Sequence, residues 1–77
     1  MGTWNVRILV KHHNTDQQLL FPAEVYYKDD KATEPRGWSP FSAEGDELED
    51  VLFYALELNK AITRPVLDAD DLTIQYA

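Results

Sequence analysis

The chain has 77 residues, no cysteine and a formal net charge of −7, with a pI near 4.5. A chain of this length forms one domain with a modest core, and disulfides cannot support it. The acidic balance argues against direct binding to nucleic acid or to an anionic membrane, because both need clustered Lys and Arg.

Hydropathy is that of a folded chain without a membrane span. Apolar residues make up 44% of the sequence, which argues against wholesale disorder. No apolar run approaches the ~20 residues that span a bilayer. The first residues lack a basic region followed by an apolar stretch, so we expect no signal peptide. We therefore expect a single α+β domain over residues 1–77 with a cytoplasmic location.

The net charge is confined to the second half of the chain. Residues 1–38 carry five acids and five bases, whereas residues 39–77 carry nine acids against Lys60 and Arg64. The acidic half also holds the one clear helical pattern. This division predicts a surface that meets a partner, without identifying that partner.

Two alternating segments open the chain. Alternation over residues 4–11 places four apolar side chains on one face: Trp4, Val6, Ile8 and Val10. Residues 18–28 alternate again, and a period of two is typical of half-buried strands. The two segments predict an antiparallel hairpin around a polar turn at 12–16. Pro22 is expected to mark an edge or a bulge, because proline cannot donate to a ladder.

A polar loop over residues 29–37 and a short third strand over 38–42 lead to a helix. The helix is predicted from six apolar residues at helical spacing: Leu48, Val51, Leu52, Ala55, Leu58 and Ile62. Asp46 is the expected N-cap, with Glu49 completing a capping box, and Pro65 stops the helix. We expect the apolar face to be buried on the sheet, so that Leu52→Ala costs ~2–5 kcal/mol. Residues 72–76 alternate and predict a fourth short strand, paired within the protomer or with a neighbour.

The predicted fold is a small antiparallel three-stranded sheet with one helix packed on one face, in the order β-β-β-α. One helix covers one face of such a sheet and leaves the other bare. We expect the bare face to carry an apolar patch with a charged rim, which often marks a contact surface. Together with an acidic helix face it supplies the candidate partner-binding residues: Arg7, Leu9, Leu20, Glu24, Tyr26, Glu49, Asp50 and Glu57.

Four blocks of the sequence resemble a family of short bacterial proteins. The blocks are residues 24–30, 37–39, 45–51 and 64–68, which read EVYYKDD, GWS, GDELEDV and RPVLD. The family pattern reads EVYYDEDG, GWT, PVSP, GES-LEEL and KPVLD, and the likeness spans most of the chain. The family is uncharacterised, so the resemblance implies a fold and no activity. This chain departs from it at Glu47, where the family has Ser as helix cap, and at residues 31–34, where the family has a Gly turn.

A second resemblance is to antitoxins of the HicB type. In those proteins two or three strands lead into a Gly-[Asp/Glu]-x-Leu-Glu-Glu-Ala-Leu helix that ends in Glu-Ala-Ile. Residues 45–52 (GDELEDVL) and 60–62 (KAI) are similar to that pattern. Residues 1–77 hold no segment that resembles the DNA-binding extension of those antitoxins. The likeness implies an antitoxin-like role.

Candidate catalytic or metal-binding groups are few. His12 and His13 are neighbours that point apart in a strand or tight turn, which favours a solvated turn over a metal site. The acidic stretch 68–71 lacks the Gly and the distal Glu of a calcium loop. Glu24 is expected to point outward and to pair with Arg7 or Lys11 across the sheet. We expect no enzyme, no metal and no cofactor.

The sequence therefore predicts a non-enzymatic protein-interaction or regulatory module. Its expected partner is another protein or a second copy of the chain in a homodimer, with no direct nucleic-acid partner and no membrane. Two alternatives stay open. One is an acidic inhibitor, antitoxin-like or a nucleic-acid mimic, that binds a basic partner; the other is an enzyme.

Overall fold

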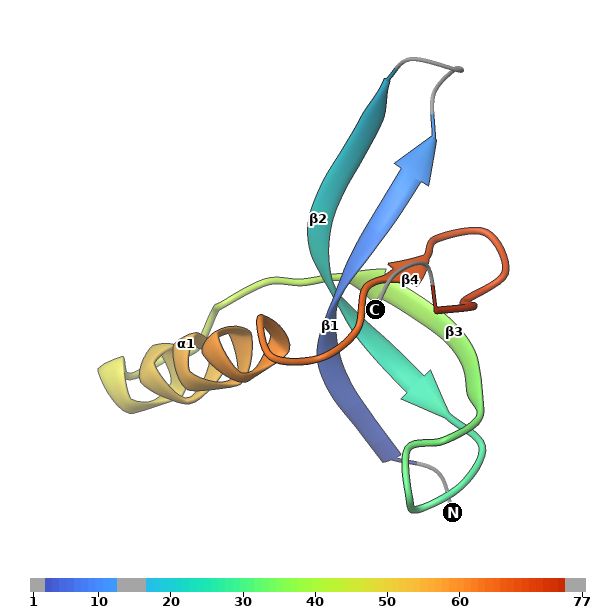
Figure 1. Ribbon diagram of the computed structural model, residues 1–77. Coiled ribbons are helices and arrows are strands. Elements are labelled where there is room, and N and C mark those ends of the chain that lie inside the picture. Colours follow the sequence, from blue (N-terminus) through green and yellow to red (C-terminus); the bar gives the residue numbers. More distant parts are fainter. Residues whose placement is uncertain (1–2, 13–16, 75–77) are drawn as a thin grey trace.

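A long, twisted antiparallel hairpin forms the centre of the molecule in the computed structural model, which describes residues 3–12 and 17–74 (Figure 1). Its strands are β1 (Thr3–His12) and β2 (Gln18–Tyr27). The other elements follow in the order β3 (Pro35–Pro40), α1 (Leu48–Ala61) and β4 (Leu67–Asp68). The predicted α+β class, with antiparallel strands followed by one helix, is confirmed.

The four strands form one mixed sheet in the order β3-β2-β1-β4. Strands β1, β2 and β3 are antiparallel, whereas β4 runs parallel to β1 with Leu67 beside Leu9. Pro22 lies just beyond the last β2–β3 pair, where β2 has a free edge on that side. The third strand begins three residues earlier than predicted.

The fourth strand is not where the alternation of residues 72–76 predicted it. It comes at Leu67, directly after the chain leaves Pro65 and returns along β1. Ile74 forms one antiparallel bridge with Leu67. Residues 75 and 76 lie outside the described part of the chain. Burial of Leu67 in the core explains why pairing begins there.

The register of the hairpin differs from the one we expected. Arg7 lies opposite Ala23, and Leu9 lies opposite Phe21. Directly opposed residues share a face, so Arg7 and Leu9 lie on the other side of the sheet from Tyr26. The predicted apolar patch of Leu9, Leu20 and Tyr26 is therefore wrong. Alternation within each strand is visible in the sequence, but the turn between the strands decides which faces combine.

The face that carries Leu9 holds a hydrophobic core cluster. Its buried residues come from three strands and the tail: Leu9, Ala23, Val25, Tyr27, Leu67 and Ala69. The indole nitrogen of Trp38 donates a hydrogen bond to the carbonyl oxygen of Ala69 at 2.8 Å, which fixes the tail over this face. The C-terminal segment therefore covers the side of the sheet that we expected to be bare.

Helix α1 meets the opposite face of the sheet near the start of β1. The ring of Trp4 contacts the rings of Phe53 and Tyr54, with centroids 6.4 Å apart in each pair. Beyond the helix, the guanidinium of Arg64 donates to the carbonyl oxygen of Val6 at 2.9 Å. Figure 1 shows the C-terminal end of α1 beside β1, with its N-terminal end pointing away from the sheet.

The helix begins one residue later than predicted. Its N-cap is Glu47, whose amide donates to the carboxylate of Asp50 at 3.2 Å. The prediction of Asp46 and Glu49 as the capping pair is wrong. Gly45 explains the local path, because a Cβ at that position would overlap the Cβ of Asp50. The absence of a side chain at Gly45 lets Asp50 fold back over the preceding turn.

Candidate functional site

Helix α1 leaves most of its apolar side chains in solvent. Leu48 is 75% exposed, Leu52 is 54% and Leu56 is 61%, and the C-cap residue Ile62 is 71% exposed. Ala61 is the only helix residue that is fully buried. The prediction that the face with Leu48, Leu52 and Ile62 is buried on the sheet is therefore wrong. Large exposed apolar surfaces of this kind mark contact sites on small proteins.

A narrow strip of α1 makes the contact with the sheet. Tyr54 and Leu58 are half-buried and Ala61 is buried, at the i, i+4 and i+7 positions of one helix face. Apolar residues occupy more than half of the helix circumference. The helical spacing therefore indicated an amphipathic helix, but it did not indicate which part of the apolar arc meets the sheet.

The outward side of the helix has the spacing of a helix-pairing seam. Its five positions alternate in steps of four and three, and all are exposed: Leu48, Leu52, Ala55, Asn59 and Ile62. This spacing keeps side chains on the line along which two helices pack side by side. The helix is about 21 Å long at 1.5 Å per residue, so the strip covers four turns. We call these five residues the α1 seam.

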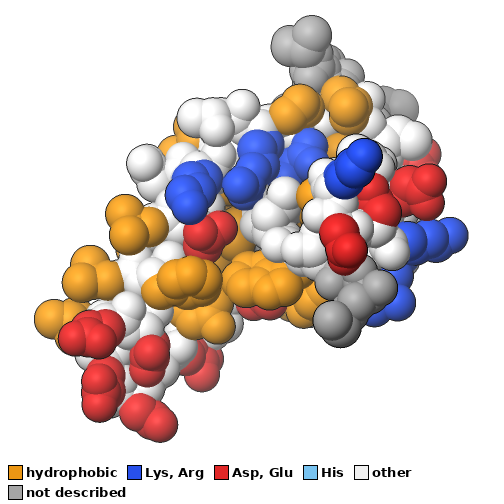
Figure 2. Space-filling view, turned by 90° about the horizontal axis from the view of Figure 1, so that it is seen from below, with side chains coloured by type: hydrophobic (Ala, Val, Ile, Leu, Met, Phe, Trp, Pro, Cys, Tyr) orange, Lys and Arg blue, Asp and Glu red, His pale blue; other side chains and the backbone are white. Residues whose placement is uncertain are grey.

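Charge is divided between the two ends of the helix. Acids crowd the first turn, where Glu49 and Asp50 lie, and Lys60 lies in the last turn with Arg64 beyond it. Figure 2 shows carboxylates at the free tip of α1, hydrophobic side chains along its length, and cations toward the sheet. The arrangement suits the helix dipole, which favours anions at the N-terminal end and cations at the C-terminal end.

The acidic residues predicted as partner contacts do lie on α1, but two of them also serve the helix itself. Asp50 accepts a hydrogen bond from the amide of Glu47. Glu57 is half-buried and forms an ion pair with Lys60 at 3.1 Å. Glu49 is exposed beside the seam.

The predicted sheet residues divide between the two faces. Arg7 and Leu9 are buried on the core face and form no exposed patch. Glu24 lies opposite Val6, so its expected pairing with Arg7 or Lys11 is wrong. It instead accepts a hydrogen bond from the hydroxyl of Tyr26 at 3.3 Å.

On the opposite face of the sheet from Leu9, Leu20 is 54% exposed. The hydroxyl of Tyr26 also lies 2.9 Å from that of Ser39. The candidate residues therefore do not form one surface.

The acidic turn after β4 is built from hydrogen bonds within the chain. One oxygen of Asp68 accepts from the amides of Asp70 and Asp71, and Asp71 accepts from the hydroxyl and amide of Thr73. The Thr73 hydroxyl lowers the pKa of Asp71. His12 lies 3.9 Å from Asp68, and its neighbour His13 lies outside the described residues. Within residues 3–12 and 17–74, no group of three acidic or histidine side chains could hold a metal ion.

Leu56, Phe53 and Asn59 were not predicted from the sequence as surface residues. The alternating steps of four and three along the seam could have indicated Asn59, whereas Phe53 and Leu56 lie off that spacing. In the part of the chain that the structure describes, no helix is long and apolar enough to cross a membrane.

No model of a known protein family, no curated protein and no solved structure matches this chain, so the two resemblances above stay predictions.

Proposed function

We propose that this protein is a non-enzymatic interaction module that associates with a second copy of itself through the α1 seam. The observation that carries the proposal is the exposure of Leu48, Leu52 and Ile62 along one line of a helix. The interaction role predicted from the sequence is retained, but its surface moves from the sheet to the helix.

The free energy gained by burying apolar side chains favours a binding partner on the α1 seam. A helix of 14 residues is marginal in water and depends on packing. Fully burying one Leu or Ile side chain contributes about 1.5–3 kcal/mol. The whole stability of a 77-residue domain is about 4–12 kcal/mol. Covering the seam therefore contributes an amount comparable to a large part of the folding free energy.

Charge complementarity favours a second copy in an antiparallel arrangement. If two helices cross at Ala55, Leu48 of one copy faces Ile62 of the other, and the acidic first turn meets the end with Lys60 and Arg64. A parallel pair would place the two acidic ends side by side, where like charges repel. The small side chain of Ala55 at the crossing point lets the helix axes approach closely.

Sedimentation equilibrium over a range from low micromolar to near-millimolar protein tests the proposal. The expected mass rises with concentration from 8.9 kDa toward twice that value. Leu52→Glu is expected to keep the chain monomeric by placing a charge in the seam. Leu20→Glu is the matched control, since Leu20 on β2 has the same 54% exposure but lies off the helix. A monomer at every concentration, or dimers lost only in Leu20→Glu, would contradict the proposal.

A further inference from the structure

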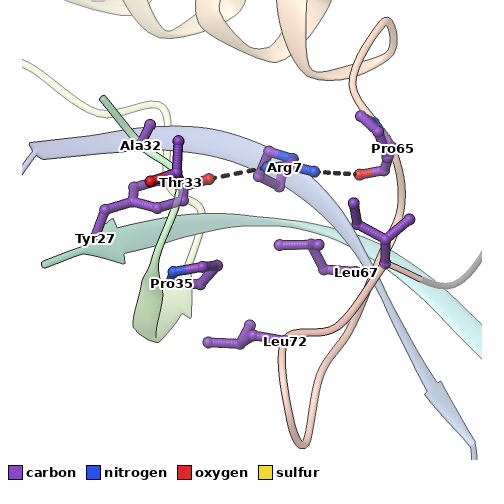
Figure 3. A pocket seen from close by; sticks show the side chains of 9 residues that line it. Arg7, Tyr27, Ala32, Thr33, Pro35, Pro65, Leu67 and Leu72 are labelled. Atoms are coloured by element: carbon purple, nitrogen blue, oxygen red, sulfur yellow. Dashed lines mark hydrogen bonds between the residues drawn. The ribbon is translucent and has the colours of Figure 1, made fainter. Parts of the chain in front are cut away.

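A cavity of about 400 Å³ lies on the core face of the sheet, away from the α1 seam (Figure 3). Three separate segments form its apolar walls: the loop after β2, the chain at Pro65 to Leu67, and the tail at Leu72 and Ile74. Arg7 from β1, Tyr27 from β2 and Thr33 from the loop after β2 contribute polar side chains. Ligand pockets have volumes of ~300–1,000 Å³, so this cavity suits a small molecule.

The side chain of Arg7 is buried at this cavity without an opposite charge. It is 8% exposed, and one terminal nitrogen donates to the hydroxyl of Tyr27 at 3.0 Å. The other donates to the carbonyl oxygen of Pro65 at 2.7 Å. The Nε atom is buried with no hydrogen-bond partner, and among the described residues no carboxylate forms an ion pair with Arg7.

A buried cation of this kind lacks compensation. Arginine stays charged at any physiological pH, and burying an unpaired charge is costly. Two neutral acceptors satisfy part of the guanidinium, whereas the Nε–H is buried and has no acceptor. The Nε–H and a neighbouring terminal N–H form a fork that fits the two oxygens of a carboxylate.

The cavity walls also hold the two left-handed residues of the described chain outside glycine. Ala32 has φ 57° and Leu72 has φ 60°. Each such conformation costs about 1–3 kcal/mol in a non-glycine residue, and they concentrate at ligand clamps. Both side chains line the same cavity, on separate segments that Figure 3 shows around Arg7.

We propose that this cavity binds a small monocarboxylate with an apolar body, whose carboxylate pairs with Arg7. One guanidinium with no second cation among the lining residues matches one negative charge rather than the nearly two of a phosphate group. The apolar walls match a short alkyl chain or a single ring. The net charge of −7 does not oppose this locally, because exposed charges beyond ~8 Å are screened.

Titration with hexanoate, followed by ¹H–¹⁵N NMR, tests the proposal. Saturable shifts are expected at the Arg7 Nε–H resonance and at the amides of Leu67 and Leu72. Hexan-1-ol has the same chain without the charge and is expected to bind at least about tenfold more weakly, because a charge-assisted hydrogen bond is lost. Equal affinities for the two probes, or no shift at Arg7, would overturn the proposal.

Two variants locate the binding within the cavity. Ile74→Trp at the mouth, where Ile74 is exposed, is expected to abolish hexanoate binding while the spectrum stays that of the folded protein. Arg7→Lys keeps the charge but removes the fork, and is expected to weaken binding, whereas Arg36→Lys on the exposed part of β3 leaves it unchanged. If Arg7→Lys fails to fold, hexanoate binding by Ile74→Trp is the test of the site. Undiminished binding by a folded Ile74→Trp contradicts the proposed site. The seam variant Leu52→Glu is expected to bind hexanoate normally, since the two sites are separate.

Discussion

The indole of Trp4 packs against the ring of Tyr54 with a centroid distance of 6.4 Å, and this contact joins α1 to the start of β1. Phe53, which precedes Tyr54 in the helix, contacts the same indole. The remaining sheet contacts of α1 come from a narrow strip, so these rings supply much of the attachment. Trp4 is therefore one anchor of the helix on the first strand, beside the buried Ala61.

Trp4→Ala is expected to lower the free energy of unfolding by about 1–3 kcal/mol and to reduce helix content, because it removes the aromatic contacts of α1. Far-ultraviolet circular dichroism during urea unfolding measures both effects. Leu20→Ala serves as the control, since Leu20 is exposed on β2. An unchanged helix signal in Trp4→Ala would show that the attachment lies elsewhere.

Gly45→Ala is expected to destabilise the protein by about 1–3 kcal/mol, because the new Cβ overlaps the Cβ of Asp50 and displaces the helix start. Gly37→Ala is the matched control. A Cβ at Gly37 meets no atom within 4 Å, so a change within about 0.5 kcal/mol is expected. Equal losses in the two variants, measured by thermal or urea unfolding, would contradict this account of the helix start.

Leu52→Ala is expected to change the free energy of unfolding by less than about 1 kcal/mol in dilute solution, where the chain is monomeric. Leu9→Ala is expected to cost ~2–5 kcal/mol, because Leu9 is fully buried. The effect of Leu52→Ala should grow with protein concentration, since dimerisation stabilises the folded state by mass action. Urea unfolding at low and high concentration measures this. If Leu52→Ala lowered the free energy of unfolding by several kcal/mol in dilute solution, Leu52 would be buried in the monomer, and this account of the helix would be contradicted.

Thr33→Ala is expected to raise the pKa of Asp29 toward its ordinary value. The hydroxyl of Thr33 donates to the Asp29 carboxylate and, with the amides of Thr33 and Glu34, holds that pKa low. Because the folded-state pKa of Asp29 is lowered, its ionised carboxylate stabilises the fold at pH values above the ordinary pKa. This stabilisation is lost as the pH falls through the folded-state pKa. Carbon-detected NMR titration of Asp29 measures the shift. Thr63→Ala is the control, because its hydroxyl donates to a main-chain carbonyl; a matching rise of the Asp29 pKa there would refute the mechanism.

The sequence was sufficient for the hairpin and the helix, but not for the position of β4 or for how the faces of the elements combine. Alternation predicted the hairpin of β1 and β2, and apolar spacing with Pro65 predicted the helix. The burial of Leu9 followed from the register of the hairpin, which the turn sets and which alternation within a strand does not contain. Leu52 is exposed because a different side of the helix, with Tyr54 and Ala61, meets the sheet. A helix apolar around more than half its circumference leaves that choice to tertiary packing.

The cavity could not be predicted for a related reason. Arg7 alternates with apolar residues as a surface residue of a strand would, and Leu72 and Ala32 carry no sign of a left-handed backbone. These residues meet because the tail folds back over the core face, where Trp38 bonds to Ala69. Contacts between residues this distant in the chain are set by the complete fold.

Asn59→Leu is expected to strengthen self-association, because a polar residue within an otherwise apolar helix seam reduces the stability of the pair. Sedimentation equilibrium should give a dimer dissociation constant at least about tenfold lower than that of the unchanged chain. Thr3→Val on β1 is the control. Asn5→Leu is unsuitable as a control, because Asn5 accepts a hydrogen bond from the hydroxyl of Tyr27. Unchanged or weaker association of Asn59→Leu would place the contact outside the seam.

Disulfide trapping tests antiparallel pairing through α1 most directly, because the chain has no cysteine of its own. Leu48→Cys and Ile62→Cys are prepared separately and oxidised alone and as a mixture, and the products are weighed by mass spectrometry. Antiparallel pairing predicts a disulfide between the two different variants in the mixture and little product from either alone. Disulfides formed readily by each variant with itself, and none between them, would contradict it.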